Sequence, residues 1–217
     1  MDLREALYTT RAMRRVEDRP IPQDVQAKIL DAAIRAPSGG NNQNWRFLLI
    51  DDQSVMAQIA PIYRECMAYL WSNYYKARVD AAAAQPDLDD SKQFVQMQRS
   101  AQYLADHFEK YPLLLFGFAQ HDPSGGSIYP AIWSAMLAAR GEGVGSALTS
   151  ALVFRKDDVL PILGVPPDEG WHMACCITFG YPTGKWGVAG RNPVEQVAYR
   201  NHWGEPLGFE VDGPLYP

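Results

Sequence analysis

The chain has 217 residues, of which 47% are hydrophobic and 21% charged, and this composition excludes both a disordered chain and a fibrous one. Its net charge of -5 at pH 7 argues against general binding of nucleic acid, which needs a basic surface. The longest apolar runs, such as residues 113–119, are far shorter than the roughly 20 residues that cross a bilayer, so we expect no contact with a membrane.

The N-terminus and the cysteines indicate the compartment. Acidic residues at positions 2 and 5 and the lack of an apolar stretch behind them do not fit a secretory signal, so we expect a cytoplasmic protein. The spacing of Cys66, Cys175 and Cys176 suits neither a disulfide framework nor a Cys-x-x-Cys metal site. We therefore expect these cysteines to be buried small side chains.

Hydrophobic periodicity predicts the elements in chain order. Pro22 stands where a first helical residue is expected, and Pro37 ends the pattern behind it, which predicts a helix over residues 22–36. Apolar runs and alternation predict strands at residues 46–50, 113–119, 144–149 and 171–179. Helical patterning covers residues 54–83, 91–110, 127–140 and 155–163, with a turn within residues 80–91. The class is therefore α+β or α/β, with one central sheet wrapped by helices.

The first candidate motif is the run of three arginines at positions 11, 14 and 15. In an acidic chain this cluster is locally unusual, although a solvated charged segment is the ordinary explanation. The alternative is an anion site, because guanidinium groups bind phosphate oxygens in a bidentate way and stay charged at physiological pH. A single bound phosphate fits better than nucleic acid, since acidic residues follow at positions 17 and 18.

The second candidate is the connection of residues 36–45, which is rich in small residues and amides. An ordinary loop is one reading, but connections of this kind are commonly two to six residues and need no such density of amides. Asn and Gln side chains both donate and accept hydrogen bonds, which suits a ring that carries alternating C=O and N–H groups.

The third candidate is the glycine turn at residues 140–146. It follows a predicted helix and opens a predicted strand, the reverse of the dinucleotide-binding order, so a helix C-cap at Gly141 explains it as well. Motifs for phosphate loops, nucleophile elbows and zinc proteases are missing, and the four histidines are scattered. We therefore expect no metal site.

Four motifs follow one another along the chain: Arg11-x-x-Arg-Arg15, Ala36-Pro-Ser-Gly-Gly-Asn-x-Gln-x-Trp45, Gly141-x-Gly-Val-Gly145, and Phe179-Gly-Tyr-Pro182 with Arg191 behind it. Taken together and in this order, they resemble the FMN-dependent nitroreductase family. The resemblance covers nearly the whole chain and implies an α+β fold, with a mixed central β-sheet flanked by helices. It also implies an intertwined homodimer with two FMN sites at the subunit interface.

The resemblance implies a single FMN-binding domain over residues 1–217, with residues 60–110 as a helical substrate-facing region. Residues 200–217 form an extended tail that carries Trp203, Leu207 and Phe209 between glycines and prolines. Such a tail needs a surface to cover, and we expect this to be the partner subunit. The alternative is that the tail folds back on its own domain.

The family motifs also imply roles for individual residues. Arg11, Arg15 and Arg191 correspond to phosphate and ribityl ligands, and Ala12 and Met13 lend backbone groups. The wall beside the isoalloxazine ring is then formed by Pro37, Ser38, Asn41 and Gln43. Leu148 and Thr149, followed by Ser150, would offer backbone groups near flavin N5 and O4. Arg15 is the candidate for stabilising the reduced flavin, and Gln98 and Arg99 are candidates for contacts with the pyrimidine ring.

The implied activity is transfer of hydride from NADH or NADPH through flavin N5 to a small acceptor such as a nitroaromatic or a quinone. No protein residue need act as a nucleophile, because the cofactor carries the redox chemistry. Other activities on the same scaffold, such as reductive dehalogenation, stay open because a fold does not determine its function. A flavin-binding protein without turnover is a further alternative.

Overall fold

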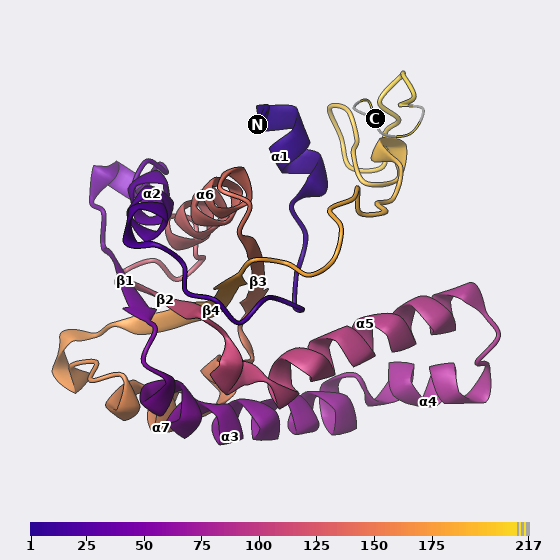
Figure 1. Ribbon diagram of the computed structural model, residues 1–217. Helices are drawn as coiled ribbons and strands as arrows, with labels where there is room; N and C mark the ends of the chain where they lie inside the picture. The colour runs from indigo at the N-terminus through magenta and orange to yellow at the C-terminus, as the bar shows by residue number, and fades with distance from the viewer. Residues whose placement is uncertain (212, 214, 216–217) are drawn as a thin grey trace.

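A four-stranded sheet forms the centre of the computed structural model, which describes residues 1–211, 213 and 215 (Figure 1). The strands are β1 (Trp45–Ile50), β2 (Leu113–Ala119), β3 (Gly145–Thr149) and β4 (His172–Gly180), in the order β1-β2-β4-β3. Each neighbouring pair is antiparallel. Among the described residues, the one parallel pairing is a single bridge between Ala12 and Ser146, at the β3 edge. The four predicted strands are thereby confirmed to within one residue at each end.

The described part of the chain also forms seven α-helices. They are α1 (Leu3–Thr9), α2 (Gln23–Ala33), α3 (Gln53–Tyr69), α4 (Lys76–Ala84), α5 (Asp89–Asp106), α6 (Ile128–Gly141) and α7 (Lys156–Ile162). None of these helices is both long and apolar enough to pass through a bilayer.

Several helix boundaries differ from the predicted ones. Pro22 is the N-cap of α2 and not its first residue, and α2 ends at Ala33. The helix predicted over residues 54–83 is divided by a π-helical turn at Leu70–Tyr74, a type of irregularity that is frequent at functional sites. At the glycine turn, Gly141 is the last residue of α6, and Gly143 takes the left-handed conformation with φ +74°. The left-handed glycine that follows the end of α6 is therefore Gly143, and not Gly141 as predicted.

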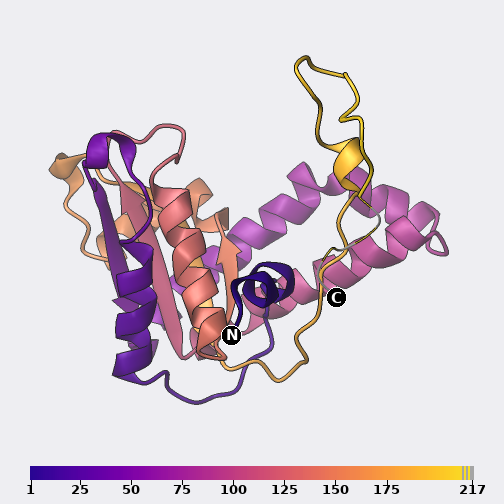
Figure 2. The same ribbon diagram turned by 90° about the horizontal axis from the view of Figure 1, so that it is seen from above.

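Apolar residues cover both faces of the sheet, because alternate residues of each strand point to opposite sides. One face packs against α2 and α6, with Leu113, Leu115 and Ile177 from the strands. The other packs against α3, α5 and α7, with Leu114 and Phe116 from β2. Figures 1 and 2 show these two helical layers on either side of the sheet.

A bulge in β4 changes the alternation predicted for residues 171–179. Gly117 pairs with Cys175 and Phe118 with Met173, so Ala174 has no opposite residue in β2. Met173 consequently packs on the face of α3, whereas Cys175 packs on the face of α2 and α6. Strict alternation over residues 171–179 predicts that these two residues share one face, and this prediction is wrong because an extra residue in a strand moves the following side chains to the other face.

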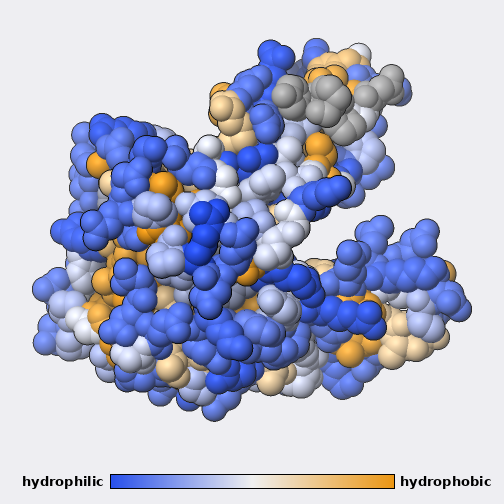
Figure 3. All heavy atoms as spheres, in the orientation of Figure 1, coloured by the Kyte–Doolittle hydropathy of each residue, from blue (hydrophilic) through white to orange (hydrophobic). Residues whose placement is uncertain are grey.

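Two segments extend away from the sheet. Helices α4 and α5 form an arm, residues 76–106, that projects to one side (Figures 1 and 2). The C-terminal tail projects separately, and the surface between tail and arm is deeply hollowed (Figure 3). Trp203 is 91% exposed and Phe209 53% exposed, so neither ring is buried against its own domain. Positions 212, 214, 216 and 217 of the predicted tail lie outside the described residues.

Burial of the cysteines leads to a prediction about alkaline pH. All three are free and buried, as expected, and desolvation raises the pKa of Cys175 from 9.0 to about 12. In the unfolded chain the thiol ionises from about pH 9, while in the folded chain it stays protonated. This pKa shift contributes about 4 kcal/mol to the free energy of unfolding. The contribution is fully present below pH 9 and is lost as the pH rises to about 12.

We therefore expect the free energy of unfolding in urea to fall steeply between pH 9 and pH 11, and Cys175→Ala to make the fall shallower. Burial likewise raises the pKa of Tyr63 to about 12, which adds to the decline above pH 10. A free energy of unfolding that stays constant from pH 8 to pH 11 would contradict this assignment.

Candidate functional site

The arginine segment lies against the free edge of β3. The Met13 N–H donates to the Ser146 carbonyl at 2.9 Å, next to the bridge at Ala12. This approach requires glycine at position 145, since a Cβ there would lie 2.7 Å from Met13 Cβ. Glycine is required at position 180 for the same reason, because a Cβ added there would lie 2.6 Å from Val16 Cβ. The glycines of two sequence motifs thus bring residues 12–16 onto the sheet.

A cavity of about 640 Å³ opens beside this segment, within the usual range for small-molecule sites. The chain that leaves β4 passes over it, and the Arg11 guanidinium donates to the Lys185 carbonyl at 2.9 Å. One face of α5 forms the opposite wall. The lining residues are Arg11, Ala12, Met13, Arg14, Arg15, Gln93, Gln96, Met97, Ser100, Gly184, Lys185, Val188, Ala189 and Gly190.

The charge of this cavity is strongly one-sided. Four cationic residues line it, Arg11, Arg14, Arg15 and Lys185, and no acidic residue of the described chain is among the lining. Burial lowers the pKa of Arg14, whose guanidinium donates to Ser100 Oγ at 3.3 Å. The Arg15 guanidinium lies over the Tyr103 ring, 4.5 Å from its centroid. Such a set of guanidinium and ammonium groups suits a phosphate-bearing ligand.

Thr149 lies at the far end of β3, on the same edge of the sheet. Its Oγ1 accepts from the Ala151 N–H at 3.3 Å and from the Tyr63 hydroxyl at 3.2 Å. Leu148, beside it, is 37% exposed although it belongs to the central sheet. The edge of β3 therefore leads from the basic cavity to the exposed Leu148 and the half-buried Thr149.

Arg191 is next to the cavity without lining it. Its guanidinium donates to the neighbouring Gly190 carbonyl at 2.8 Å, and Gly190 does line the cavity. The structure thus brings Arg11 and Arg15 to one cavity, and Arg191 directly follows a lining residue, Gly190, in the sequence.

The loop before β1 has an unusual backbone. The backbone φ angle is positive at Gly40 (59°), Asn41 (55°) and Gln43 (52°). Residues other than glycine and asparagine rarely adopt such angles. Hydrogen bonds hold the loop: the Gln43 N–H donates to Ser38 Oγ at 3.2 Å, and the Gln43 amide to Asn41 Oδ1 at 3.3 Å. The side chains of Asn41 and Gln43 are exposed. Strain of this kind is concentrated at functional sites.

The structure does not bring this loop to the basic cavity within one chain. The loop precedes β1, whereas the arginine segment lies against β3, at the opposite edge of the sheet. Trp45 of β1 pairs with Ala119 of β2, which in turn pairs with His172 at one end of β4. Gly145 of β3 pairs with Gly180 at the other end of β4. At about 3.3 Å per residue, the two ends of β4, His172 and Gly180, are roughly 25 Å apart along the strand. The two predicted halves of the site thus occupy diagonally opposite corners of the sheet.

Comparison with known proteins places this geometry in a family. The model of the nitroreductase family matches residues 7–181, which is most of the chain. The chain belongs to the nitroreductase family. This nitroreductase-family chain is 26% identical to the NADH dehydrogenase of Thermus thermophilus over 206 residues, covering 91% of this chain and 95% of that one. It is also 26% identical to the 5,6-dimethylbenzimidazole synthase of Rhodobacter capsulatus, covering 83% of each.

Other matches are shorter or concern the fold alone. Against two archaeal relatives, from Methanothermobacter thermautotrophicus and Archaeoglobus fulgidus, the matched part spans only 33% of each relative. Iodotyrosine deiodinase bound to FMN and 3-iodo-L-tyrosine has a TM-score of 0.73 at 22% identity, covering 93% of this chain and 100% of that one. A nitroreductase with bound FMN from Desulfitobacterium hafniense has a TM-score of 0.65 at 18% identity, covering 92% and 99%. These structures show that the nitroreductase fold is shared.

Several residues that line this candidate site were not among the residues singled out from the sequence. Residues 93, 96, 97 and 100 recur at helical spacing on α5, and that periodicity could have identified them. Of the two residues that were candidates for the pyrimidine ring, Gln98 lines neither cavity, and Arg99 lines a neighbouring cavity and not this one. Lys185 had no local signal, because its place depends on how the chain leaves β4.

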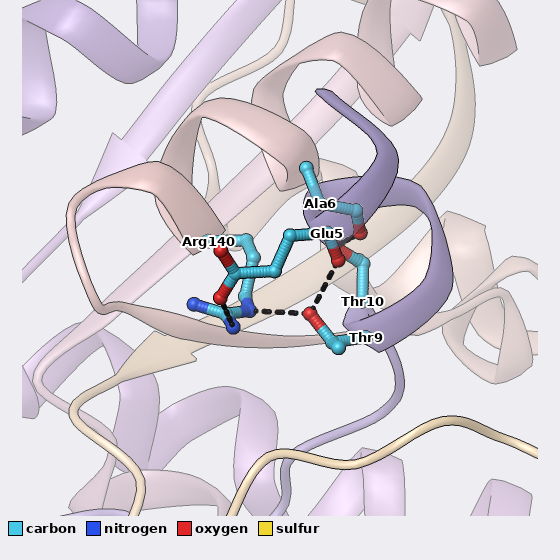
Figure 4. A network of polar contacts seen from close by, with 5 residues as sticks. All are labelled: Glu5, Ala6, Thr9, Thr10 and Arg140. Atoms are coloured by element: carbon cyan, nitrogen blue, oxygen red, sulfur yellow. Dashed lines mark hydrogen bonds and ion pairs between the residues drawn. The ribbon is translucent and has the colours of Figure 1, made fainter. Parts of the chain in front are cut away.

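Arg140 of this nitroreductase-family chain contacts two segments that are far apart in the sequence. It is buried at the end of α6, and its guanidinium donates to Thr9 Oγ1 at 2.9 Å and pairs with Glu5 at 3.1 Å (Figure 4). It also lies over the Trp186 ring, 4.0 Å from the centroid. Arg140 therefore holds to α6 both helix α1, which precedes Arg11 in the sequence, and the segment beside Lys185, whose carbonyl accepts from Arg11.

We expect Arg140→Met to destabilise the protein by about 2–3 kcal/mol, because charge-assisted hydrogen bonds and a cation–π contact are lost from a buried position. Arg155→Met is a matched control, since Arg155 makes ion pairs with Glu65 and Asp158 but is exposed. Exposed pairs contribute little, so the control should cost less than about 1 kcal/mol. Urea unfolding measures the free energy of unfolding of both variants. Equal losses in the two variants would show that the buried contacts of Arg140 stabilise the protein no more than the exposed ion pairs of Arg155 do.

Proposed function

We propose that this chain is an FMN-dependent oxidoreductase that takes hydride from NADH or NADPH and passes reducing equivalents to a small acceptor, such as a nitroaromatic or a quinone. The observation that carries this proposal is the cavity beside the β3 edge, with four cationic lining residues and no acidic one among the described residues. The deiodinase and the Desulfitobacterium nitroreductase, which share the fold, are both described with FMN. FMN is a mononucleotide and therefore carries a phosphate group, which the cationic side chains of this cavity can bind.

The residues present fit FMN in their chemistry. Arg11, Lys185 and Arg191 would hold the phosphate, and the backbone of Ala12 and Met13 would border the ribityl chain. Arg15 would offset negative charge that reduction places on the ring, and Leu148 and Thr149 would lie beside the reacting edge. When bound, FMN supplies hydride acceptance and delivery at N5. Among the described residues, no cluster of His, Cys, Asp or Glu could hold a metal ion.

We also propose that the working unit is an intertwined homodimer. The loop residues Pro37, Ser38, Asn41 and Gln43 would then face the cavity of the partner subunit, which accounts for their distance from the arginine segment of their own chain. The exposed rings of Trp203 and Phe209 are suitable anchors for an interface, where aromatic residues are enriched. The mass in solution tests this part: sedimentation should give about twice the 24.3 kDa of one chain, and a mass of one chain at micromolar concentration refutes it.

The activity is tested by mixing the flavin-loaded protein with NADH or NADPH and a nitroaromatic acceptor under anaerobic conditions. We expect steady oxidation of the nicotinamide that depends on the acceptor. Bound flavin without turnover would indicate a binding protein instead.

A second activity is favoured by one comparison. Iodotyrosine deiodinase has a TM-score of 0.73 to this chain, so reductive dehalogenation is the alternative reaction on this scaffold. Release of halide from a halogenated phenol, with little reduction of nitroaromatics, would favour it over the first proposal.

A further inference from the structure

A second basic cavity adjoins the first along α5. It has a volume of about 620 Å³ and shares Arg15, Gln96 and Ser100 with the first cavity. Its other lining residues are Pro86, Lys92, Val95 and Arg99. Helix α5 borders the hollow between the arm and the tail (Figures 1 and 3).

Three cationic residues line this second cavity, and within the described chain no carboxylate lines it. Arg99 has no hydrogen-bond or ion-pair partner among the described residues. Lys92 has a single distant ion pair, at 3.8 Å with Asp89, and both side chains are largely exposed, so this pair is weak. The positive charge of the cavity is therefore not balanced by the protein, although the chain as a whole is acidic.

The proposed cofactor does not account for this charge. FMN has one phosphate, and Arg11 and Lys185, which line the first cavity and not the second, are available for it. The cations at positions 92 and 99 consequently remain for a different anion. Pro86 and Val95 give the same cavity an apolar wall that suits a ring.

We propose that the electron acceptor is an aromatic compound carrying a carboxylate, and that Arg99 and Lys92 bind this carboxylate. The inference rests on the proposed function and specifies its substrate class. A guanidinium group matches a carboxylate with two parallel hydrogen bonds, and the ammonium of Lys92 adds a second charge. Arg15, shared by both cavities, lies between the carboxylate and the cofactor, so the ring of the acceptor would extend toward the first cavity.

The test compares 4-nitrobenzoate with 4-nitrobenzamide, which have the same ring and nitro group but differ in charge. We expect the wild-type enzyme to have a KM about tenfold lower for the benzoate. Arg99→Gln should raise that KM about tenfold and leave the KM for the benzamide unchanged. Lys76→Gln is the matched control, because it removes one positive charge from the same arm outside both cavities, and it should change neither KM.

A binding measurement keeps the test independent of turnover. Calorimetric titration of the purified protein with benzoate and benzamide, which cannot be reduced, should show tighter binding of benzoate in the wild type and equal binding in Arg99→Gln. Equal binding in the wild type would overturn the inference. So would an Arg99→Gln effect on the KM for NADPH alone, since it would assign the cavity to the phosphates of the donor. If the flavin-loaded protein oxidises neither NADH nor NADPH with any nitroaromatic or quinone, the proposed function fails, while the titration still decides whether the cavity selects a carboxylate.

Discussion

Replacing both Arg11 and Arg15 with alanine is expected to weaken FMN binding by more than a hundredfold. Each guanidinium lines the same cavity, and one lost charge-assisted partner costs about 1.5–3 kcal/mol, or roughly tenfold to 150-fold in affinity. The two losses need not add fully, because both residues act on one ligand. Both side chains lie at the cavity and outside the apolar core, so the fold should survive.

Fluorescence titration of the flavin-free protein with FMN measures this effect. Arg4→Ala is the matched control, since Arg4 is exposed on α1 and does not line the cavity. Its affinity for FMN should equal that of the wild type. If the double variant also retained wild-type affinity, the basic cavity would not be the cofactor site.

The second large effect concerns how the site is divided between two chains. The arginine variant Arg11→Ala/Arg15→Ala and a loop variant, Asn41→Ala/Gln43→Ala, should each bind FMN poorly as homodimers. In a heterodimer of the two, the intact arginine segment of one chain faces the intact loop of the other. One site is then complete and the other carries both defects. We expect the heterodimer to bind one FMN per dimer with wild-type affinity.

Co-expression with two different affinity tags isolates this heterodimer, and the bound flavin is then counted. A site contained within one chain predicts the opposite result, because each chain of the heterodimer would carry a defect in its own site. A heterodimer without any tight FMN site would therefore contradict the shared site, and with it the reason we give for the distance between loop and cavity.

The sheet could be predicted closely because its strands are encoded locally. The apolar run of residues 113–119 forms the central strand β2, which is buried on both faces, and its ends were predicted correctly. The bulge at Ala174 could not be predicted, since it depends on pairing with a strand more than 50 residues away. Helix α1 was missed because it is short and has a single buried residue, Ala6, so it carries no periodic pattern.

The candidate site was predicted in part for the same reason. The arginine segment and the amide-rich loop have unusual local compositions that mark them in the sequence. Lys185 and Arg140 do not, because each acquires its place through contacts between distant segments: Lys185 through Arg11, and Arg140 through Glu5 and Trp186. That the loop and the arginines lie at opposite corners of the sheet follows from the strand order, which no single segment specifies.

The flavin content of the purified protein tests the central claim most directly. We predict a yellow protein with the absorption bands of oxidised flavin, which releases FMN on heating in an amount close to one per chain. Chromatography of the released flavin distinguishes FMN from FAD. Recovery of FAD as the main flavin, or failure to bind flavin after addition of excess FMN, would contradict the claim that the cavity beside β3 is an FMN site.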